Sequence, residues 1–405
     1  MINWITDNLA TIPKSEVDEN IYKIIDVRDM VDKKGNPARL ILEKIDAAIK
    51  LIKAKYKVVI CCDYGLSRSN AIAVGILVKH FSYNFEEAVK FVLKKTGQDL
   101  IELGLLNSVR RALGIVDKKP KNKKTILITG ADGFIGSALC NLLKNKYHLI
   151  TPKKSEIDLM KGPIELDLLV KKFSPSLIIH LANPKIYTTN QAMSEMILML
   201  KNVLDVCREN KISIVFPSNW VVFSGHKNRL ITAQSSLSPK PGDTYGQAKF
   251  LCEILLNQYK ENYGVNVAII RFSPVYGPGS NRPKFIWNFF EKAKKNIPIY
   301  THKYKNGFPV LDLLNIKDAV SAVESVLKKK FSGVINIGSG IGFSTFEIAK
   351  KIKELCHSKS EVFFREMDDY TSNVVMDRSD AKKTLGWSPK ITLDDGLKEI
   401  LKSLN

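Results

Sequence analysis

A glycine-rich stretch between a predicted strand and a predicted helix constrains the fold of this chain more than any other segment. Residues 125–139 read TILITGADGFIGSAL, a short apolar run followed by three glycines at G-x-x-G-x-x-G spacing. The run predicts a buried parallel strand, and the apolar spacing after it predicts a helix. Free N–H groups and the helix dipole attract phosphate, so the stretch predicts a dinucleotide-binding turn. The predicted cofactor-binding residues are Gly130, Asp132, Gly133, Phe134, Ile135 and Gly136.

Size, charge and cysteine content limit the class of protein. The chain has 405 residues, enough for two or three domains, with no long apolar run and no signal-peptide pattern. Its six cysteines show neither metal-ligand nor disulfide spacing, so we expect a reduced cytoplasmic protein without a metal site. The net charge of +21 comes from lysines spread along the chain. This distribution favours a solvated surface suited to anionic substrates over nucleic-acid binding or membrane insertion.

A second strand-to-helix junction lies in the first 112 residues. The strand-like segment KVVICC (57–62) runs into CDYGLSRS (62–69), so five residues separate Cys62 from Arg68. Loop N–H groups and a helix dipole can lower a thiol pKa, and the Arg68 guanidinium can hold two phosphate oxygens. Cys62 is therefore the predicted nucleophile for attack on phosphorus. The Ser69 hydroxyl can assist departure of the thiolate from the phosphocysteine.

This segment resembles the signature of the dual-specificity cysteine-dependent phosphatases, H-C-x-x-G-x-x-R-[ST]. The resemblance covers about residues 1–112 and implies a phosphate-binding loop formed by Asp63, Tyr64, Gly65, Leu66, Ser67 and Ser69. It also implies an aspartate general acid, for which we expect Asp32, with Asp29 as the alternative. Cys61 stands at the family's histidine position, which alters the hydrogen bonding around the loop. The implied substrate is a phosphorylated protein or a phosphometabolite.

Two other interpretations of this junction stay open. A phosphate-binding pseudophosphatase would keep the loop but have no turnover. A buried cysteine pair with a surface arginine would have no function in phosphate chemistry.

Two lysines bear on the choice of cofactor. NAD-selective folds usually carry an acidic residue after the second strand, where it binds the ribose 2′-hydroxyl. Thr151, Lys153 and Lys154 occupy that region here. Cations there suit a 2′-phosphate, so we expect NADP as the cofactor, with NAD as the alternative. Two ordinary surface lysines would explain the same residues.

A tyrosine and a lysine follow at Y-x-x-x-K spacing. Tyr245 and Lys249 lie in TYGQAKF, after the strand-like ISIVFPSNWVVFSG (212–225). On a helix, residues four apart share one face. Lys249 could then depress the Tyr245 pKa and hold a nicotinamide ribose. Tyr245 would donate or accept the proton in a hydroxyl–carbonyl interconversion.

Residues 124–405 resemble the extended short-chain dehydrogenase/reductases, the branch that includes nucleotide-sugar epimerases, dehydratases and reductases. TGADGFIG, HLAN, VVFSG, YGQAK, RFSPVYGPG, LLNIKDAVSAV, GVINIGSG and AKKTLGWSPKITLDDGL follow one another in family order. So many motifs in order exclude a chance glycine loop. The resemblance implies that Leu181 and Ala182 bind the cofactor, together with Tyr245 and Lys249.

The chain departs from this family at two positions. Asn219 stands where the family has its catalytic Ser or Thr; it can donate a hydrogen bond to a substrate oxygen but cannot relay a hydroxyl proton. Ser218 could act as a substrate contact only if the strand register shifted by one. Pro274 occupies the place of an Asn found in many epimerases. Arg282 and Arg365 are predicted to hold a nucleotide diphosphate, or else are surface arginines.

These observations predict a bifunctional α/β protein. Residues 1–115 form a small phosphatase-type α/β domain, 116–124 a lysine-rich linker, and 125–405 a Rossmann doubly wound parallel sheet with a C-terminal substrate lobe. The expected activities are NAD(P)-dependent conversion of a nucleotide sugar and cysteine-dependent phosphatase activity, and a homodimer is an option. One alternative is a non-catalytic dinucleotide sensor that regulates the phosphatase. Another is an active reductase fused to a pseudophosphatase adaptor.

Overall fold

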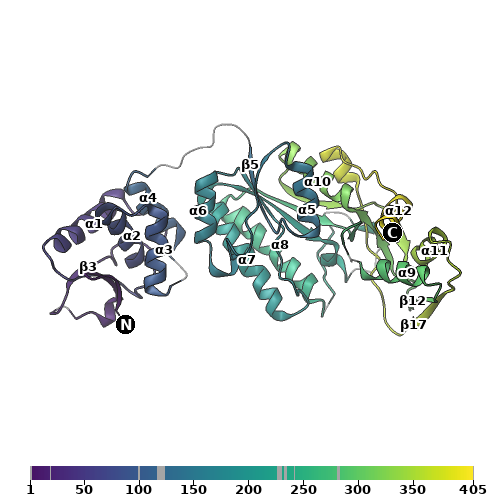
Figure 1. The fold of residues 1–405 in the computed structure, drawn as a ribbon, viewed down its shortest axis with the longest axis horizontal. Helices are drawn as coiled ribbons and strands as arrows, with labels where there is room; N and C mark the ends of the chain where they lie inside the picture. Colours follow the sequence, from purple (N-terminus) through teal and green to yellow (C-terminus); the bar gives the residue numbers. More distant parts are fainter. Residues whose placement is uncertain are drawn as a thin grey trace. The chain divides into compact units, whose positions relative to one another are not determined.

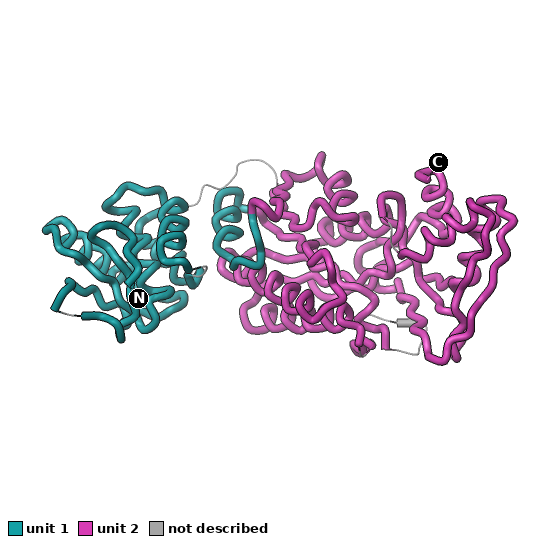
Figure 2. The backbone as a smooth tube through the Cα atoms, turned by 60° about the horizontal axis from the view of Figure 1, so that its bottom comes forward, with its two compact units in different colours: residues 1–122, 157–174 teal, residues 123–156, 175–405 magenta. Residues whose placement is uncertain are grey.

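The chain forms two compact units (Figure 2). Unit 1 comprises residues 1–122 and 157–174, and unit 2 comprises residues 123–156 and 175–405. The grouping of 157–174 with unit 1 differs from the predicted domain boundaries, which place this segment in the C-terminal domain. Of the predicted linker 116–124, only Lys124 is among the described residues. The structure is a computed structural model that describes residues 2–18, 20–98, 101–115, 124–225, 230–231, 235–240, 242–280 and 283–404.

Unit 1 is built on a mixed sheet whose strands, within the described residues, lie in the order β1-β2-β4-β3. β1 is antiparallel to β2, whereas β2 and β3 both run parallel to the central β4. The strands are β1 (Asn3–Thr6), β2 (Leu9–Pro13), β3 (Lys23–Asp26) and β4 (Val58–Cys62). The helical elements are η1 (Lys14–Glu16), α1 (Ala38–Lys53), α2 (Arg68–Phe81), α3 (Phe85–Thr96), α4 (Leu103–Ala112), η2 (Leu159–Lys161) and α6 (Ile164–Phe173).

Strand alternation separates the two adjacent cysteines of β4. All five residues of this strand are buried, as expected for a parallel strand in the middle of a sheet. Cys61 packs with Ala10, Ile12 and Val59 on one face. Cys62 therefore points to the other face, and it is the last residue before the loop that leads to α2.

Unit 2 contains the Rossmann-like parallel sheet that the glycine stretch predicts. Its strands, among the described residues, lie in the order β15-β10-β8-β7-β5-β6, and every neighbouring pair is parallel. Apolar side chains of β5, β7 and β10 form one core with residues of α5 and α10. The strands are β5 (Thr125–Thr129), β6 (His148–Ile150), β7 (Leu177–His180), β8 (Ser213–Asn219), β10 (Val267–Phe272) and β15 (Gly333–Ile337).

Helices cover both faces of this sheet. α5 packs against α10 and α7 packs against α8, and the two pairs lie on opposite faces (Figure 1). The helical elements of unit 2 are α5 (Phe134–Leu143), α7 (Asn190–Asn210), η3 (Trp220–Phe223), α8 (Thr244–Tyr263), α9 (Lys284–Lys294), α10 (Ile316–Lys329), α11 (Thr345–Leu355), η4 (Ala381–Leu385) and α12 (Leu393–Ser403). Within the described ranges, no helix is both long and apolar enough to cross a membrane.

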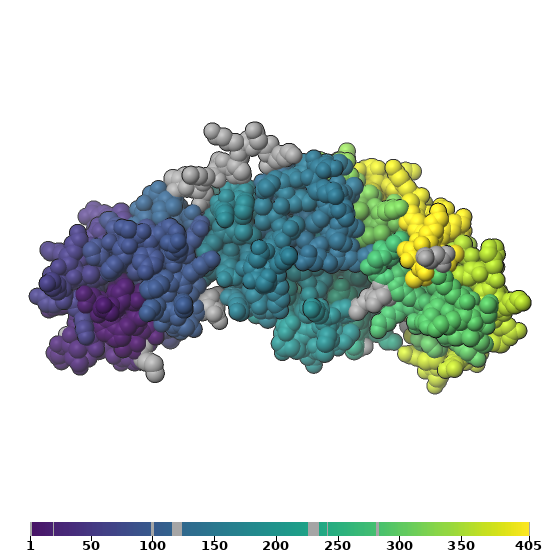
Figure 3. All heavy atoms as spheres, viewed as in Figure 1, coloured from purple at the N-terminus to yellow at the C-terminus, as the bar shows by residue number. Residues whose placement is uncertain are grey.

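The C-terminal part of unit 2 forms a lobe with its own apolar core, to which α9, α11 and α12 contribute. Its residues, coloured green to yellow, gather into one surface in Figure 3. Short strand pairs complete the lobe and its border with the sheet. They are β9 (Leu230–Ile231) with β18 (Val375–Met376), β11 (Val275–Tyr276) with β14 (Leu314–Asn315), β12 (Ile299–Tyr304) with β17 (Val362–Met367), and β13 (Val310–Asp312) with β16 (Gly342–Ser344).

Replacing Gly136 by alanine should destabilise unit 2, because a Cβ there would overlap the carbonyl oxygen of Gly130 and the backbone of Ala131. The backbone would have to shift, at a cost of about 1–3 kcal/mol, measurable by urea denaturation of the full-length protein. Ser137→Ala is the matched control: Ser137 is the next residue of α5 and is exposed. Its substitution should change stability by less than about 0.5 kcal/mol. Equal stability of Gly136→Ala and the wild type would contradict this close approach.

Candidate functional site

The glycine-rich loop lies where the strand order of the unit 2 sheet reverses direction. β5 has β6 on one side and β7 on the other, so the chain crosses β5 between these two strands. In open α/β sheets, ligands bind outside the carboxyl ends of the strands at such a switch point. The loop between β5 and α5, together with the residues that follow β7, therefore borders the expected dinucleotide site.

The backbone of this loop fits the pyrophosphate of a dinucleotide. Gly130 has φ +70°, and a Cβ there would lie 2.6 Å from the backbone nitrogen of Ala182. α5 begins at the N-cap Gly133, which has no side chain to receive the first N–H groups. These donors are available to an anion at the positive end of the helix dipole. Asp132, Phe134 and Ile135 lie in the same turn as Gly133.

The end of β7 is fixed to the end of β5 by a buried polar contact. The Thr129 hydroxyl lies 2.8 Å from His180 Nδ1 and accepts a hydrogen bond from the backbone N–H of Ala182 at 3.3 Å. Burial, aided by the nearby Lys249, lowers the pKa of His180 to about 3, so the imidazole is neutral at physiological pH. Leu181 and Ala182 thus lie directly against Gly130, in the position predicted for cofactor contact.

The turn after β6 carries the two lysines that favour NADP. Lys153 and Lys154 are exposed, close to the carboxyl end of β6. A carboxylate that no motif marks in the sequence lies in the same turn: Glu156 accepts a hydrogen bond from the Lys153 N–H at 2.7 Å. The turn therefore presents two ammonium groups and one carboxylate.

Tyr245 and Asn219 meet at the edge of the sheet. Asn219 ends β8 and caps η3 by accepting a hydrogen bond from the Val221 N–H at 3.3 Å. Burial raises the pKa of Tyr245, and a hydrogen bond with Asn219 acts against this effect. Two residues predicted to be catalytic are therefore near each other at the carboxyl end of β8.

Lys249 lies one helical turn after Tyr245 and is buried beneath it. Its ammonium donates to the carbonyl oxygen of Pro217 at 3.1 Å and lies 4.5 Å from the centre of the Phe216 ring. Its distance to the centre of the Tyr245 ring is 5.7 Å. Burial lowers the pKa of Lys249 to about 8.

Ser218 does not share the face of Asn219. Its hydroxyl is buried and donates to Glu253 at 2.5 Å. The Glu253 carboxylate in turn accepts two hydrogen bonds from Arg271 Nε at 3.1 Å and one from Nη2 at 2.7 Å. The structure thus gives Ser218 a partner in the interior instead of the predicted substrate contact, because neighbouring strand residues point to opposite faces.

A second tyrosine, Tyr187, lies beside Tyr245. The rings of Tyr187 and Tyr245 have centroids 4.8 Å apart, with an interplanar angle of 50°. Tyr187 follows β7 by a few residues, in a segment without regular secondary structure. No motif marks it in the sequence, since its relation to Tyr245 depends on the path of this loop.

Of the two arginines predicted to bind substrate, the structure describes Arg365 but not Arg282. Arg365 lies on the exposed strand β17, with its guanidinium carbon 4.9 Å from the centre of the Tyr300 ring. Tyr300 also stacks on Phe363 at a centroid distance of 5.5 Å. Arg282 lies outside the described residues. The carbonyl oxygen of Pro274 accepts a hydrogen bond from the Leu314 N–H at 3.0 Å.

In unit 1, Cys62 lies at the base of the loop that precedes α2. Its Sγ is 3.5 Å from the Ser69 hydroxyl oxygen. Burial acts to raise the pKa of the Cys62 thiol, but hydrogen bonds from Ser69 and from the backbone N–H groups of Gly65 and Tyr64 outweigh it, so the pKa lies below its usual value. The loop therefore favours the thiolate, which is the reactive form of cysteine.

The conformation of this loop depends on a glycine. Gly65 has φ +67°, and a Cβ there would lie 2.7 Å from the backbone of both Ile12 and Pro13. The side chains of Tyr64 and Leu66, on either side of Gly65, are exposed. The loop is thus held close to β2 while these two side chains face solvent, where they could contact a substrate.

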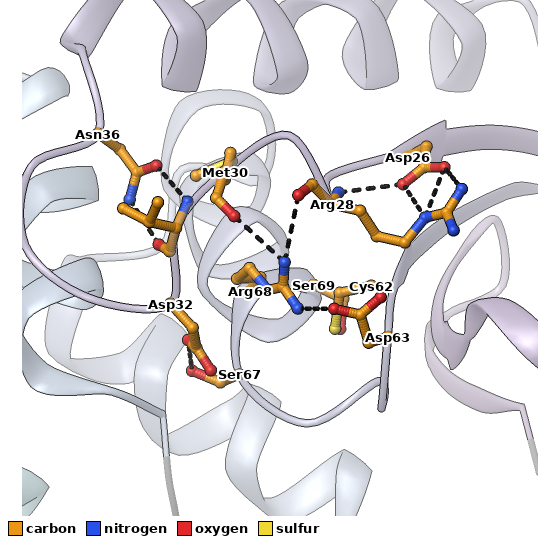
Figure 4. A network of polar contacts seen from close by, with 11 residues as sticks. Asp26, Arg28, Met30, Asp32, Asn36, Cys62, Asp63, Ser67, Arg68 and Ser69 are labelled. Atoms are coloured by element: carbon orange, nitrogen blue, oxygen red, sulfur yellow. Dashed lines mark hydrogen bonds and ion pairs between the residues drawn. The ribbon is translucent and has the colours of Figure 1, made fainter.

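Arg68 and Asp32 each contact a residue of the loop (Figure 4). Arg68 Nη1 donates to the carbonyl oxygens of Arg28 and Met30, and Nη2 pairs with Asp63. Asp32 accepts a hydrogen bond from the Ser67 hydroxyl at 2.6 Å. The other candidate for the general acid, Asp29, is turned to Lys44 at 2.8 Å.

Comparison with known proteins places unit 2 in a family. An uncharacterized UDP-glucose epimerase of Bacillus subtilis is 28% identical over 305 residues, which cover 67% of this chain and 95% of that protein. A UDP-glucose 4-epimerase of Thermus thermophilus in complex with NAD superposes with a TM-score of 0.59 at 21% identity, covering 69% of this chain and 98% of the other. A GDP-mannoheptose C4 reductase of Campylobacter jejuni with NADP bound gives a TM-score of 0.59 at 22% identity, covering 70% and 99%.

The two solved structures share the fold of unit 2 and hold NAD in one case and NADP in the other. The family match itself extends over residues 126–338, from the first strand of the sheet to the end of its last strand, and covers no residue before 126. With more than half of its length matched, the chain belongs to the NAD dependent epimerase/dehydratase family.

Proposed function

We propose that unit 2 is an NAD(P)-dependent oxidoreductase or epimerase that acts on a nucleotide sugar, with NADP as the expected cofactor and NAD as the alternative. The observation that carries this proposal is the grouping of Tyr245 with Asn219 at the end of β8 and with Lys249 buried one helical turn away. When bound, the nicotinamide would exchange hydride with a sugar carbon. The relatives that epimerise or reduce nucleotide sugars support the same substrate class.

Each residue of this group has a distinct role in the proposed reaction. The Tyr245 phenol gives a proton to, or takes one from, the oxygen on the reacting sugar carbon. The Lys249 ammonium lies close enough to favour the phenolate form that arises during the reaction. Asn219 donates a hydrogen bond to the same sugar oxygen and, unlike a serine, holds it without relaying a proton.

The exposed aromatic side chains of β12 and β17 support a nucleotide as the other half of the substrate. Tyr300 and Phe363 form a stacked pair, and the Arg365 guanidinium lies over Tyr300. An aromatic face of this kind can stack on a base, and an adjacent guanidinium can hold a diphosphate.

Lys153 and Lys154 would bind the 2′-phosphate of NADP by charge.

Replacing Tyr245 by phenylalanine should lower turnover by about 10²–10⁴-fold, because the proton donor is lost while the ring is kept. The assay is NADPH consumption with a panel of UDP-linked and dTDP-linked 4-keto sugars. Tyr263→Phe changes the same group near the other end of α8 and should retain full activity. NADPH affinity should be unchanged in both variants. Full turnover by Tyr245→Phe would contradict the proposed role, and cofactor binding without turnover in the wild type would favour a dinucleotide sensor.

The buried lysine offers a test that needs no substrate. The pKa of Lys249 is about 8 in the folded protein against 10.5 for a free lysine, so the unfolded chain binds more protons between these values. The free energy of unfolding of the wild type should therefore rise between about pH 8 and about pH 10. Lys249→Met should lack this rise. The measurement is urea denaturation of both proteins over this pH range. The same pH dependence of the free energy of unfolding in the two proteins would show that the ammonium is not desolvated.

For unit 1 we infer a second activity, cysteine-dependent hydrolysis of a phosphomonoester. The observation in its favour is the hydrogen bonding that stabilises the Cys62 thiolate, donated by Ser69 and loop N–H groups. The thiolate would attack phosphorus as the ester oxygen leaves, and Asp32 would protonate that oxygen. Water would then displace the thiolate from the phosphocysteine, releasing inorganic phosphate. Arg68 would hold the equatorial oxygens.

Replacing Cys62 by serine should abolish p-nitrophenyl phosphate hydrolysis and leave the reaction of unit 2 unchanged. Cys61→Ser is the matched control, because it alters the neighbouring thiol on the other face of β4. This control should keep most of the phosphatase activity. Hydrolysis that survives in Cys62→Ser would exclude the phosphocysteine route. Oxyanion binding without hydrolysis in the wild type would instead favour a pseudophosphatase adaptor.

A further inference from the structure

Two of the three guanidinium nitrogens of Arg68 have hydrogen-bond partners, and the third has none among the described residues. The side chain is 12% exposed. Nη1 is fixed by the carbonyl oxygens of Arg28 at 3.3 Å and Met30 at 3.2 Å. Nη2 pairs with the carboxylate of Asp63, whereas Nε is buried and has no partner among the described residues (Figure 4). The backbone contacts of Nη1 thus orient the edge formed by Nε and Nη2.

That edge is the part of the guanidinium best suited to an oxyanion. Two parallel N–H donors on one edge bind two oxygens of a phosphate in a bidentate fashion. In the present arrangement, one donor of this pair is satisfied by Asp63 and the other is not satisfied. A buried donor without a partner is unfavourable, so an anion that engages both donors would complete the edge.

Asp63 is the acidic residue of this region that engages Arg68. Asp26 is held by the Arg28 side chain, Asp29 by Lys44, and Asp32 by the Ser67 hydroxyl. Asp63 directly follows Cys62 in the chain, and its side chain is 50% exposed, so it can leave Arg68 without opening the core.

We propose that the Asp63 carboxylate is a built-in competitor for phosphate, which occupies the Arg68 guanidinium in the empty loop and must be displaced when phosphate binds. This proposal rests on the phosphatase function inferred for unit 1 and concerns the affinity of the same loop. A displaced carboxylate also remains beside the bound anion and the Cys62 thiolate, so like-charge repulsion weakens phosphate binding further. The residue after the nucleophile therefore sets the affinity of the loop for oxyanions.

The test is calorimetric titration of the full-length protein with tungstate and with inorganic phosphate. Asp63→Asn should bind both anions about tenfold more tightly than the wild type, the effect expected from removing one partly screened like charge. Asp63→Ser should show the same direction and covers the case in which the asparagine variant folds poorly. Arg68→Met should lose binding. Asp46→Asn is the matched control, because it removes an equal charge from the Lys79 ion pair elsewhere in unit 1.

Unchanged or weaker anion binding by both Asp63 variants would overturn the proposal, as would a similar gain in Asp46→Asn. These titrations do not depend on turnover. Absent hydrolysis with tighter anion binding by Asp63→Asn would contradict the phosphatase activity but support the competitor role. Hydrolysis with unchanged anion affinity would support the phosphatase and contradict the competitor role.

Discussion

Both units place the uncapped start of a helix directly after a buried parallel strand. The N-cap of α5 is Gly133, which has no side chain, and the N-cap of α2 is Ser67, whose side chain makes no capping bond. The first N–H groups of a helix need partners from outside the helix, and the positive end of the dipole makes an anion the best one. In unit 2 this arrangement suits a pyrophosphate, and in unit 1 it suits a thiolate and a phosphate. The proposed chemistry of both units depends on these donors.

The features that could be predicted from sequence are those set by local spacing. The glycine spacing fixes the turn between β5 and α5, because Gly130 needs a positive φ and close contact with β7. The four-residue interval puts Tyr245 and Lys249 on one face of α8, and strand alternation puts Ser218 and Asn219 on opposite faces. The glycine turn needs only the conformational freedom of glycine, and the other two relations need only the period of a helix or a strand.

The features that could not be predicted depend on the path of loops. Tyr187 reaches Tyr245 from the segment after β7, and Glu156 folds back on Lys153. Asp63 looks like an ordinary loop residue in the sequence, and its pairing with Arg68 requires the full course of the loop. The partners of the two candidate aspartates, Ser67 for Asp32 and Lys44 for Asp29, likewise do not follow from the spacing in the sequence.

One face of α8 contacts β8 at three successive turns. Tyr245 meets Asn219, Lys249 meets the Pro217 carbonyl, and Glu253 meets Ser218. A helix attached at three points at regular intervals can neither slide along the strand nor rotate about its own axis without losing all three contacts. The three contacts therefore set the distance between Tyr245 and the sheet together, independently of the loops that follow the strands. Glu253 takes no part in the proposed reaction, yet it helps to fix the position of the residue that does.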